Sequence, residues 1–276
     1  MLNYKLIGYP LGHSMSPWIH EHLFAMSGHE GAYALLEIAP ESLETAFSEL
    51  QKLNGFNITI PHKVAIIPFL DELDETAERY HSVNCVVNQN GKSVGYNTDC
   101  VGFLRSVPQI KKHDNILLIG SGGVGRMMAT EAYLRKANLT IVEKNIAVAE
   151  ALKQELESPY YENTIRVLDF APDEHFDLLM NASPVGMFPK IDNCPVSDEI
   201  IANCDKVFDV IYNPTETLLV KKAKAMGKTA VGGSSMLVWQ AVNAHEIWYG
   251  FNYDPNQIDE LVREMEQEVN RLFVLK

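Results

Sequence analysis

The chain has 276 residues, 46% of them hydrophobic and 21% charged, a balance typical of folded globular proteins rather than disordered ones. Its formal net charge is −13, from 23 basic and 36 acidic residues. This balance argues against nucleic acid or an anionic membrane as a partner, because both require clustered Lys and Arg. No apolar run approaches the roughly 18 residues of a membrane span, and the N-terminus lacks a secretory pattern. We therefore expect a cytoplasmic location.

The cysteines and histidines give no sign of a metal centre. The four cysteines contain no CxxC pair, so neither a zinc ribbon nor a disulfide framework is indicated. His20 and His22 are close in sequence but cannot share one face of a helix. We expect reduced thiols and no metal.

The first hundred residues alternate between strand and helix patterns. Ser16 and Pro17 predict a helix start, as an N-cap followed by proline in the first turn, and Gly28 predicts its end. Asn90-Gly91 is a strong two-residue hairpin signal, and a hairpin implies a mixed sheet. The expected strands are residues 4–8, 33–38, 56–60, 83–87 and 93–96, and the expected helices are 16–28, 40–53 and 71–80.

From residue 115 the pattern becomes more regular, and helical stretches separate several apolar strands. The strands are expected at residues 116–119, 139–142, 165–168, 178–180, 207–210 and 229–231. Six such strands predict a doubly wound parallel sheet of the Rossmann type. The last segment, 236–275, is expected to be mostly helical.

A glycine-rich segment marks the start of this second half. Its sequence is Gly120-Ser121-Gly122-Gly123-Val124-Gly125, which fits G-x-G-x-x-G, follows an apolar strand and opens a helix. The next strand ends at Glu143. In that context the glycines allow a pyrophosphate to approach the backbone, the helix N-terminus faces it, and the acid binds a ribose. The segment therefore predicts a dinucleotide site.

Glu143 bears on which dinucleotide is bound. A carboxylate accepts hydrogen bonds from the adenosine ribose hydroxyls of NAD, but repels the 2′-phosphate of NADP by about 4 kcal/mol for unit charges ~4 Å apart at an effective dielectric of 20. Lys144 follows directly and offsets part of this repulsion. We expect NAD to be preferred, with NADP as a possible cofactor.

Four polar segments occur at the ends of elements in the first half. They are Gly12-His13-Ser14-Met15-Ser16-Pro17, Asn57-Ile58-Thr59-Ile60-Pro61-His62-Lys63, Ser82-Val83-Asn84 and Gly95-Tyr96-Asn97-Thr98-Asp99. Each alone has a structural explanation, such as Ser14 or Ser16 capping a helix or Lys63 lying in solvent.

Together these segments resemble the shikimate/quinate dehydrogenase family, whose members carry HSxSP, N(V/I)TxPxK, a VN step and NTD in this order. Three later segments resemble the family's NAxxxGM, DxxYxP and MLVxQ. They are Asn181-Ala182-Ser183-Pro184-Val185-Gly186-Met187, Asp209-Val210-Ile211-Tyr212-Asn213-Pro214 and Met236-Leu237-Val238-Trp239-Gln240.

The resemblance implies two α/β domains. The N-terminal, mixed-sheet domain of residues 1–103, joined by the C-terminal helices of residues 239–276, would bind a cyclic acid. Residues 104–238 would form the Rossmann-type, doubly wound NAD(P)-binding domain. The implied reaction is reversible hydride transfer between nicotinamide and one ring carbon of shikimate or quinate. We expect a monomer or a homodimer.

The resemblance also assigns roles to individual residues. Lys63 becomes the proton donor and acceptor, paired with Asp99. Asn84 and Gln240 are placed on ring hydroxyls, and Ser14, Ser16, Thr59 and Tyr212 around the carboxylate. On the cofactor side, the assigned residues are Asn181, Ser183, Met187 and Gly233, in addition to the glycine-rich segment, Glu143 and Lys144.

Some positions depart from the family pattern, so alternatives remain open. Glu143-Lys144-Asn145 stands where many NADP-using members have Asn-Arg-Ser or Asn-Arg-Thr, and Ser235 replaces a usual glycine. The alternatives are a quinate dehydrogenase, a dehydrogenase of another cyclic polyol acid, and a ligand sensor without activity. The presence of both Lys63 and Asp99 argues against the sensor.

Overall fold

The computed structural model describes residues 2–12 and 14–274, so His13 of the N-terminal motif lies outside the described residues. The chain divides into two compact units. Unit 1 comprises Met1–Gly102 and Leu237–Met265, and unit 2 comprises Phe103–Met236 and Glu266–Lys276. The division expected from the sequence keeps all of 239–276 with the first domain, whereas here the chain after Met265 groups with unit 2. The boundaries of independently folding domains stay a prediction.

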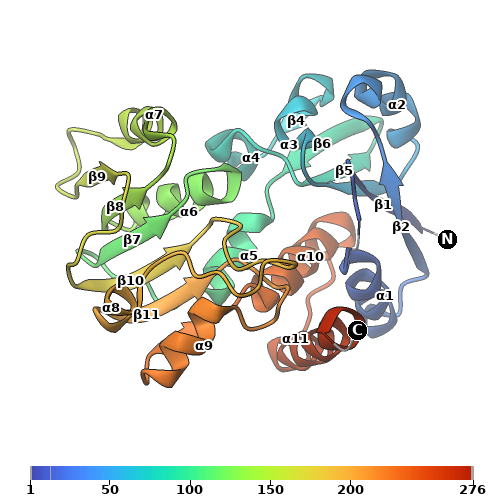
Figure 1. Cartoon of the computed structure of the whole chain (residues 1–276). Coiled ribbons are helices and arrows are strands. Elements are labelled where there is room, and N and C mark those ends of the chain that lie inside the picture. The colour runs from blue at the N-terminus through green and yellow to red at the C-terminus, as the bar shows by residue number, and fades with distance from the viewer. Residues whose placement is uncertain (1, 13, 275–276) are drawn as a thin grey trace. The chain divides into compact units, whose positions relative to one another are not determined.

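Unit 1 contains a six-stranded mixed sheet with the strand order β2-β1-β3-β5-β6-β4 (Figure 1). Its strands are β1 (Leu2–Gly8), β2 (Gly31–Glu37), β3 (Gly55–Ile58), β4 (Glu72–Leu73), β5 (Cys85–Gln89) and β6 (Lys92–Tyr96). Strand β5 is antiparallel to both β3 and β6, whereas the other pairs are parallel. Asn90 and Gly91 have φ angles of 53° and 76°, as a type I′ turn requires. The predicted hairpin and mixed sheet are confirmed.

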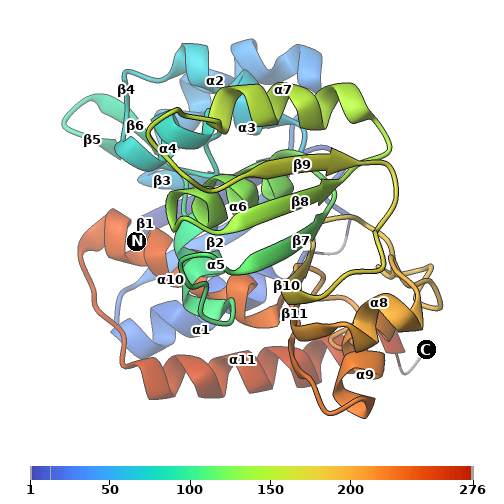
Figure 2. The same ribbon diagram turned by 90° about the vertical axis from the view of Figure 1, so that its left-hand side faces the viewer.

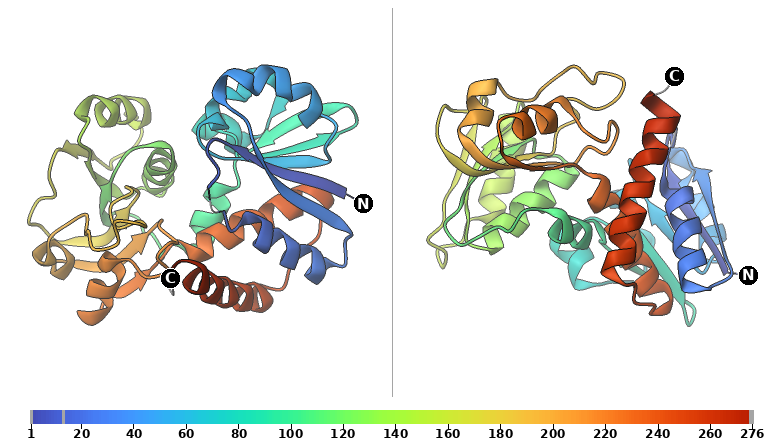
Figure 3. Two further views of the ribbon diagram at one scale, coloured as in Figure 1. Left: turned by 45° about the vertical axis from the view of Figure 1, so that its right-hand side comes forward. Right: turned by 90° about the horizontal axis from the view of Figure 1, so that it is seen from below.

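Alternating side chains bury both faces of this sheet, because successive residues of a strand point to opposite faces. Val86 joins one hydrophobic cluster with Phe56 and Phe47. Its neighbours Cys85 and Val87 belong to another cluster, which includes Tyr4, Phe24, Ala244 and Trp248. Both ends of the chain therefore contribute to the core of unit 1, and Figure 3 shows α10 (Ser234–Tyr249) and α11 (Pro255–Val269) running beside α1 (Ser16–Ser27).

The helices of the first half differ in detail from their predicted bounds. Ser16 is the first residue of α1, and Met15, not Ser16, occupies the N-cap, so the predicted cap is wrong. Gly28 ends α1 with a φ of 70°, as predicted. The region predicted as one helix at 40–53 is a 3₁₀ turn, Pro40–Ser42, followed by α2 (Leu43–Leu50), and the short α3 spans His62–Ala65. A second 3₁₀ turn, Ile67–Phe69, follows α3.

Residues 71–80, predicted as one helix, divide into β4 and α4 (Glu75–Tyr80). The division has a local cause: Asp74 accepts hydrogen bonds from the backbone N–H groups of Thr76 and Ala77, which makes Asp74 the N-cap. Helix α5 (Asp99–Ser106) begins at the NTD segment.

Unit 2 contains a six-stranded parallel sheet with the order β12-β11-β10-β7-β8-β9 (Figure 2). Its strands are β7 (Asn115–Ile119), β8 (Asn138–Val142), β9 (Ile165–Leu168), β10 (Phe176–Asn181), β11 (Cys204–Asp209) and β12 (Thr229–Val231). Numbered from β7, this is the order 3-2-1-4-5-6 of a Rossmann domain, which confirms the predicted fold. The helices are α6 (Gly123–Leu134), α7 (Ile146–Leu156), α8 (Asp198–Ala202) and α9 (Leu218–Ala225), and a π-helical turn, Asn270–Val274, follows α11.

No helix in the described part of the chain is both long and apolar enough to cross a bilayer.

Candidate active site

Lys63 and Asp99 come together in unit 1. The Nζ atom of Lys63 donates a hydrogen bond to Oδ2 of Asp99 over 2.6 Å. The two side chains are only 24% and 16% exposed, so the pair is partly shielded from water. Lys63 lies on α3, whose position is fixed by the backbone bond from Val83 N–H to the Lys63 carbonyl. The pair thus joins an amine and a carboxylate from separate stretches of chain.

Asn84 holds the other carboxylate oxygen of Asp99. Its Nδ2 group donates to Oδ1 of Asp99 over 2.8 Å and to Oγ1 of Thr98 over 3.0 Å. Its Oδ1 atom accepts from the backbone N–H of Thr98 at 2.7 Å. Gln240, from α10, reaches the same group, because its Oε1 lies 3.5 Å from the Thr98 hydroxyl. Four of the predicted residues therefore form one cluster: Lys63, Asn84, Asp99 and Gln240.

Ser14, Ser16 and Thr59 lie beyond the carboxyl ends of two neighbouring parallel strands, β1 and β3. The backbone N–H of Ser16 donates to the Ser14 hydroxyl at 3.2 Å. Thr59 packs against the end of β1, where a Cβ on Gly8 would lie 2.5 Å from its methyl group. Loops beyond the carboxyl ends of strands are a common place for ligand sites in α/β sheets.

Tyr212 differs from the other predicted substrate residues because it belongs to unit 2. It lies in the loop that follows β11, and burial raises the pKa of its hydroxyl. Its predicted contact with the substrate carboxylate stays a prediction.

The glycine-rich loop lies between β7 and α6 and requires glycine for two different reasons. Gly120 has a φ of 90°, which L-residues rarely adopt, and a Cβ on Gly125 would lie 2.2 Å from the Gly120 carbonyl oxygen. By contrast, a Cβ on Gly122 or Gly123 would meet nothing within 4 Å. Gly120 and Gly125 therefore shape the turn. Gly122 and Gly123 leave open space beside the N-terminus of α6, where Val124 lies in the first turn.

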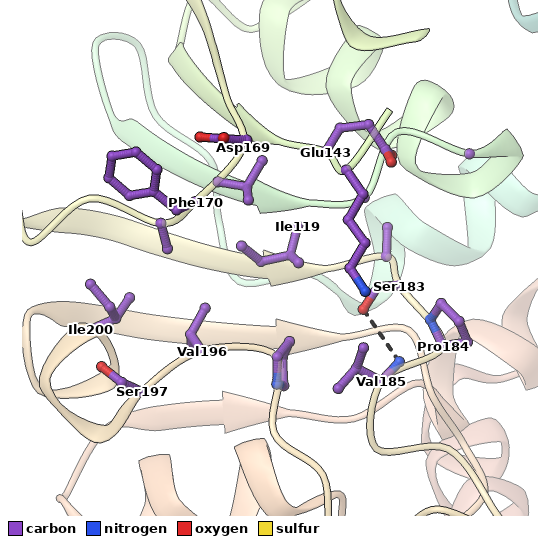
Figure 4. A pocket seen from close by; sticks show the side chains of 17 residues that line it. Ile119, Glu143, Asp169, Phe170, Ser183, Pro184, Val185, Val196, Ser197 and Ile200 are labelled. Carbon is purple, nitrogen blue, oxygen red and sulfur yellow. Dashed lines mark hydrogen bonds between the residues drawn. The ribbon is translucent and has the colours of Figure 1, made fainter. Parts of the chain in front are cut away.

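A cavity of about 690 Å³ opens at the carboxyl ends of the parallel strands of unit 2 (Figure 4). Its lining includes Gly120, Gly122, Glu143, Lys144 and Ser183 among the predicted residues. The apolar side chains Ile119, Val185, Val196 and Ile200 make up part of its wall (Figure 4). A mostly apolar cavity at the carboxyl ends of parallel strands, next to a helix N-terminus, suits a dinucleotide.

Glu143 lies at the end of β8 and contacts the glycine-rich loop directly. Its Oε2 accepts from the Ser121 N–H at 2.9 Å and from the Ser121 hydroxyl at 3.0 Å, and its Oε1 accepts from the Asn145 N–H at 3.1 Å. Burial acts to raise the pKa of Glu143, but these hydrogen bonds outweigh it and hold the pKa below the ordinary value. The side chain therefore carries a negative charge at neutral pH.

Asn181 and Ser183 are tied to Asp209, which the sequence placed in a family motif without assigning it a role. Asn181 donates to Oδ1 of Asp209 over 3.0 Å and accepts from the Ser183 hydroxyl at 2.7 Å. Thr217 donates to Oδ2 of Asp209 over 2.7 Å. Asp209 is fully buried, and burial raises its pKa to about 6. These bonds fix the loop after β10, which lines the cavity.

The remaining predicted cofactor residues are Met187 and Gly233. The Met187 side chain is exposed and is not part of the cavity lining. Gly233 has a steric need for glycine, because a Cβ there would lie 2.0 Å from the Val210 carbonyl oxygen. The sequence reasoning missed Asp169 and Phe170, which follow β9 and line the cavity (Figure 4). Their position directly after the third strand of the parallel sheet was the available signal.

The chain resembles known proteins over nearly its whole length. Residues 6–86 match the family model described as the shikimate dehydrogenase substrate binding domain. The shikimate dehydrogenase (NADP(+)) of Caldanaerobacter subterraneus is 37% identical over 271 residues, which cover 94% of this chain and 96% of the relative.

Solved structures agree with this assignment. A chorismate mutase/shikimate 5-dehydrogenase fusion protein from Clostridium acetobutylicum is 32% identical, with a TM-score of 0.87 over 98% of this chain and 99% of the other. The shikimate 5-dehydrogenase from Listeria monocytogenes, in complex with shikimate and NAD, is 27% identical, with a TM-score of 0.84 over 95% and 96% of the two chains. The chain belongs to the shikimate dehydrogenase family and is an oxidoreductase that acts on a CH–OH group.

Proposed function

We propose that this member of the shikimate dehydrogenase family interconverts shikimate and 3-dehydroshikimate, with Lys63 and Asp99 as the catalytic pair. The observation that carries the proposal is the 2.6 Å hydrogen bond between these two side chains within a cluster of the predicted substrate residues. The relatives' names supply the substrate, and the cluster supplies groups that suit it.

The chemistry requires a group that moves a proton at the reacting oxygen. A bound nicotinamide supplies the hydride acceptor or donor. Oxidation of the hydroxyl also releases a proton, and the Lys63 amine takes it from the hydroxyl oxygen and becomes an ammonium group; in the reverse direction this ammonium group returns the proton to that oxygen. Asp99 keeps the nitrogen of Lys63 in place through its Oδ2 atom, while Asn84 holds Oδ1.

The polar groups around this pair suit a small hydroxylated acid. Asn84 and Gln240 would contact ring hydroxyls, and Ser14, Ser16, Thr59 and Tyr212 would surround the carboxylate. Hydroxyl groups can bind a carboxylate by hydrogen bonds without a full counter-charge. In the ligand-free protein both amide hydrogens of Asn84 are already donated, to Thr98 and Asp99. A ring hydroxyl at Asn84 therefore donates to Oδ1 or shares one of these hydrogens.

The cavity of unit 2 suits a nicotinamide dinucleotide, and we propose a preference for NAD. The cavity lining contains two carboxylates, those of Glu143 and Asp169, but only one amine, that of Lys144. This excess of negative charge favours ribose hydroxyls over a 2′-phosphate. The curated relatives are named for NADP(+), whereas the Listeria structure contains NAD. Asn181 and Ser183 would shape the loop beside the cofactor, and Met187 and Gly233 would lie on the nicotinamide side.

Steady-state kinetics with two substrates and two cofactors test these proposals together. We expect turnover of shikimate with a higher kcat/KM under NAD than under NADP, and a lower kcat/KM for quinate. A higher kcat/KM for quinate would make the chain a quinate dehydrogenase. Absence of turnover with every pair, together with measurable shikimate binding, would indicate a ligand sensor instead.

A further inference from the structure

Tyr33 on β2 connects to the substrate cluster through Asn57, although neither its sequence position nor its residue type pointed to the site. Its hydroxyl donates a hydrogen bond to Oδ1 of Asn57 over 2.9 Å. Burial raises the pKa of this hydroxyl well above its ordinary value, and the nearby Ser16 side chain acts to lower it. Tyr33 therefore remains protonated at neutral pH and donates to Asn57.

The bond to Asn57 continues towards the catalytic pair. Asn57 is buried on β3 and donates through Nδ2 to the backbone carbonyl of Asn84 over 3.1 Å. The Asn84 side chain in turn holds Asp99. Tyr33 is thus linked through Asn57 to Asn84 and Asp99, at the proposed hydroxyl end of the substrate.

The ring of Tyr33 packs against His20, which in turn contacts a second histidine, His245. The imidazole of His20, on α1, stacks on the Tyr33 ring with the centroids 3.8 Å apart and the planes 9° from parallel. Nδ1 of His20 lies 2.9 Å from Nε2 of His245, on α10. Both imidazoles are fully buried. Each of the two helices also carries a proposed substrate residue, Ser16 on α1 and Gln240 on α10.

The His20–His245 pair contacts two tyrosine hydroxyls at its far end. Nδ1 of His245 lies 2.7 Å from the Tyr253 hydroxyl and also contacts the Tyr249 hydroxyl, and the Tyr253 hydroxyl donates to the Leu23 carbonyl. Burial lowers the pKa of His20 to about 3, so both rings hold Tyr33 as neutral groups over the physiological pH range.

We propose that Tyr33 is a positioning residue for the substrate: its hydroxyl holds Asn57 and, through it, the Asn84–Asp99 end of the site, and the His20–His245 pair fixes its ring. The inference rests on the proposed function. It predicts that the hydroxyl of Tyr33 contributes to the affinity for the cyclic acid but not to the affinity for the dinucleotide.

Tyr33→Phe tests the proposal, because it removes one oxygen and keeps the ring that stacks on His20. We expect the KM for shikimate to rise about tenfold, in line with the loss of one hydrogen bond, with kcat within about threefold and the cofactor KM within about twofold of wild type. Tyr133→Phe is the matched control, since its hydroxyl lies in unit 2, where it accepts a hydrogen bond from the Ser158 N–H at 3.1 Å. It should leave all three constants within about twofold.

The outcomes separate this inference from the function on which it rests. A wild-type protein that does not turn over shikimate refutes the proposed function before any variant is compared. If the wild type is active but Tyr33→Phe keeps its shikimate KM, or loses cofactor affinity equally, Tyr33 has no positioning role. Should Tyr33→Phe fail to fold, Asn57→Leu breaks the same path at the next residue, and an unchanged shikimate KM in that variant overturns the proposal.

Discussion

The two units build their sites in different ways. In unit 1 the proposed chemistry depends on side chains such as Lys63, Asn84 and Asp99, which come from different segments and contact one another. In unit 2 the predicted cofactor site depends first on backbone shape, and Gly120 and Gly125 cannot carry a Cβ without strain or overlap. A backbone site leaves a continuous signal in the sequence, whereas a side-chain site leaves a signal that is spread over several segments. The contrast also predicts different responses to mutation.

Lys63→Ala is expected to have the largest effect. Removal of the amine should lower kcat by about 10²-fold or more, as for other lost general acid/base groups, while the affinity for the cofactor changes by less than about twofold. Steady-state rates and fluorescence titration with the reduced cofactor measure the two effects. A variant that keeps most of its turnover would remove Lys63 from the mechanism.

Asp209→Asn tests the buried carboxylate of unit 2 through its pH dependence. Burial raises the pKa of Asp209 from 3.8 to about 6, so the folded protein binds this proton more tightly than the unfolded chain does. The free energy of unfolding should therefore fall by up to about 3 kcal/mol from this group as the pH rises from about 4 to about 6. Urea unfolding of wild type and variant at both pH values measures it. A difference between the two proteins that does not vary with pH would contradict the prediction.

Glu143→Ala is expected to change cofactor selectivity rather than overall activity. Removal of the carboxylate should raise the ratio of kcat/KM with NADP to kcat/KM with NAD about tenfold, because part of the repulsion is screened by solvent. Glu216→Ala, at an exposed pair with Lys224 outside the cavity lining, is the control. An equal ratio in wild type and Glu143→Ala would show that Glu143 does not select the cofactor.

Lys52→Ala should have the smallest effect and sharpens the first prediction. Lys52 and Glu49 form an ion pair at 2.5 Å, about as short as the Lys63–Asp99 pair, but their side chains are 68% and 70% exposed. Exposed pairs contribute little, so unfolding free energy should change by less than about 0.5 kcal/mol and kcat should not change. A large loss of activity would mean that lysine substitutions perturb the protein in general.

The sequence predicted the Rossmann unit well because each signal there is local. The glycine-rich segment, Glu143 and six apolar strands each depend on residues close in the chain, and all lie where expected. The N-cap prediction at Ser16 was wrong, because α1 begins at Ser16 itself and Met15 occupies the N-cap without a side-chain hydrogen bond to the first turn. The assignment of Lys63 and Asp99 came from family resemblance, not from periodicity.

What the sequence could not predict consists of contacts between distant positions. Tyr33 meets Asn57 across 24 residues, and His20 meets His245 across 225. Hydrophobic periodicity identifies which face of an element is buried, but it does not identify the partner of a buried polar group. The same limit concealed the partners of Asp209, whose three hydrogen-bond donors become neighbours only once the loops after β10 and β11 are folded.

The shared core of the two chain ends has a consequence for biosynthesis. The indole N–H of Trp248 donates to the Val86 carbonyl across 162 residues, and Trp248 packs on Tyr4. Tyr4 and Val86 leave the ribosome long before Trp248 is added. One face of the sheet of unit 1 therefore lacks its covering helix while most of unit 2 is synthesised. We expect nascent chains that end before Leu237 to be cut readily in residues 1–102 but to resist protease in residues 115–225. Equal resistance of both regions would show that the N-terminal segment folds without its C-terminal partner.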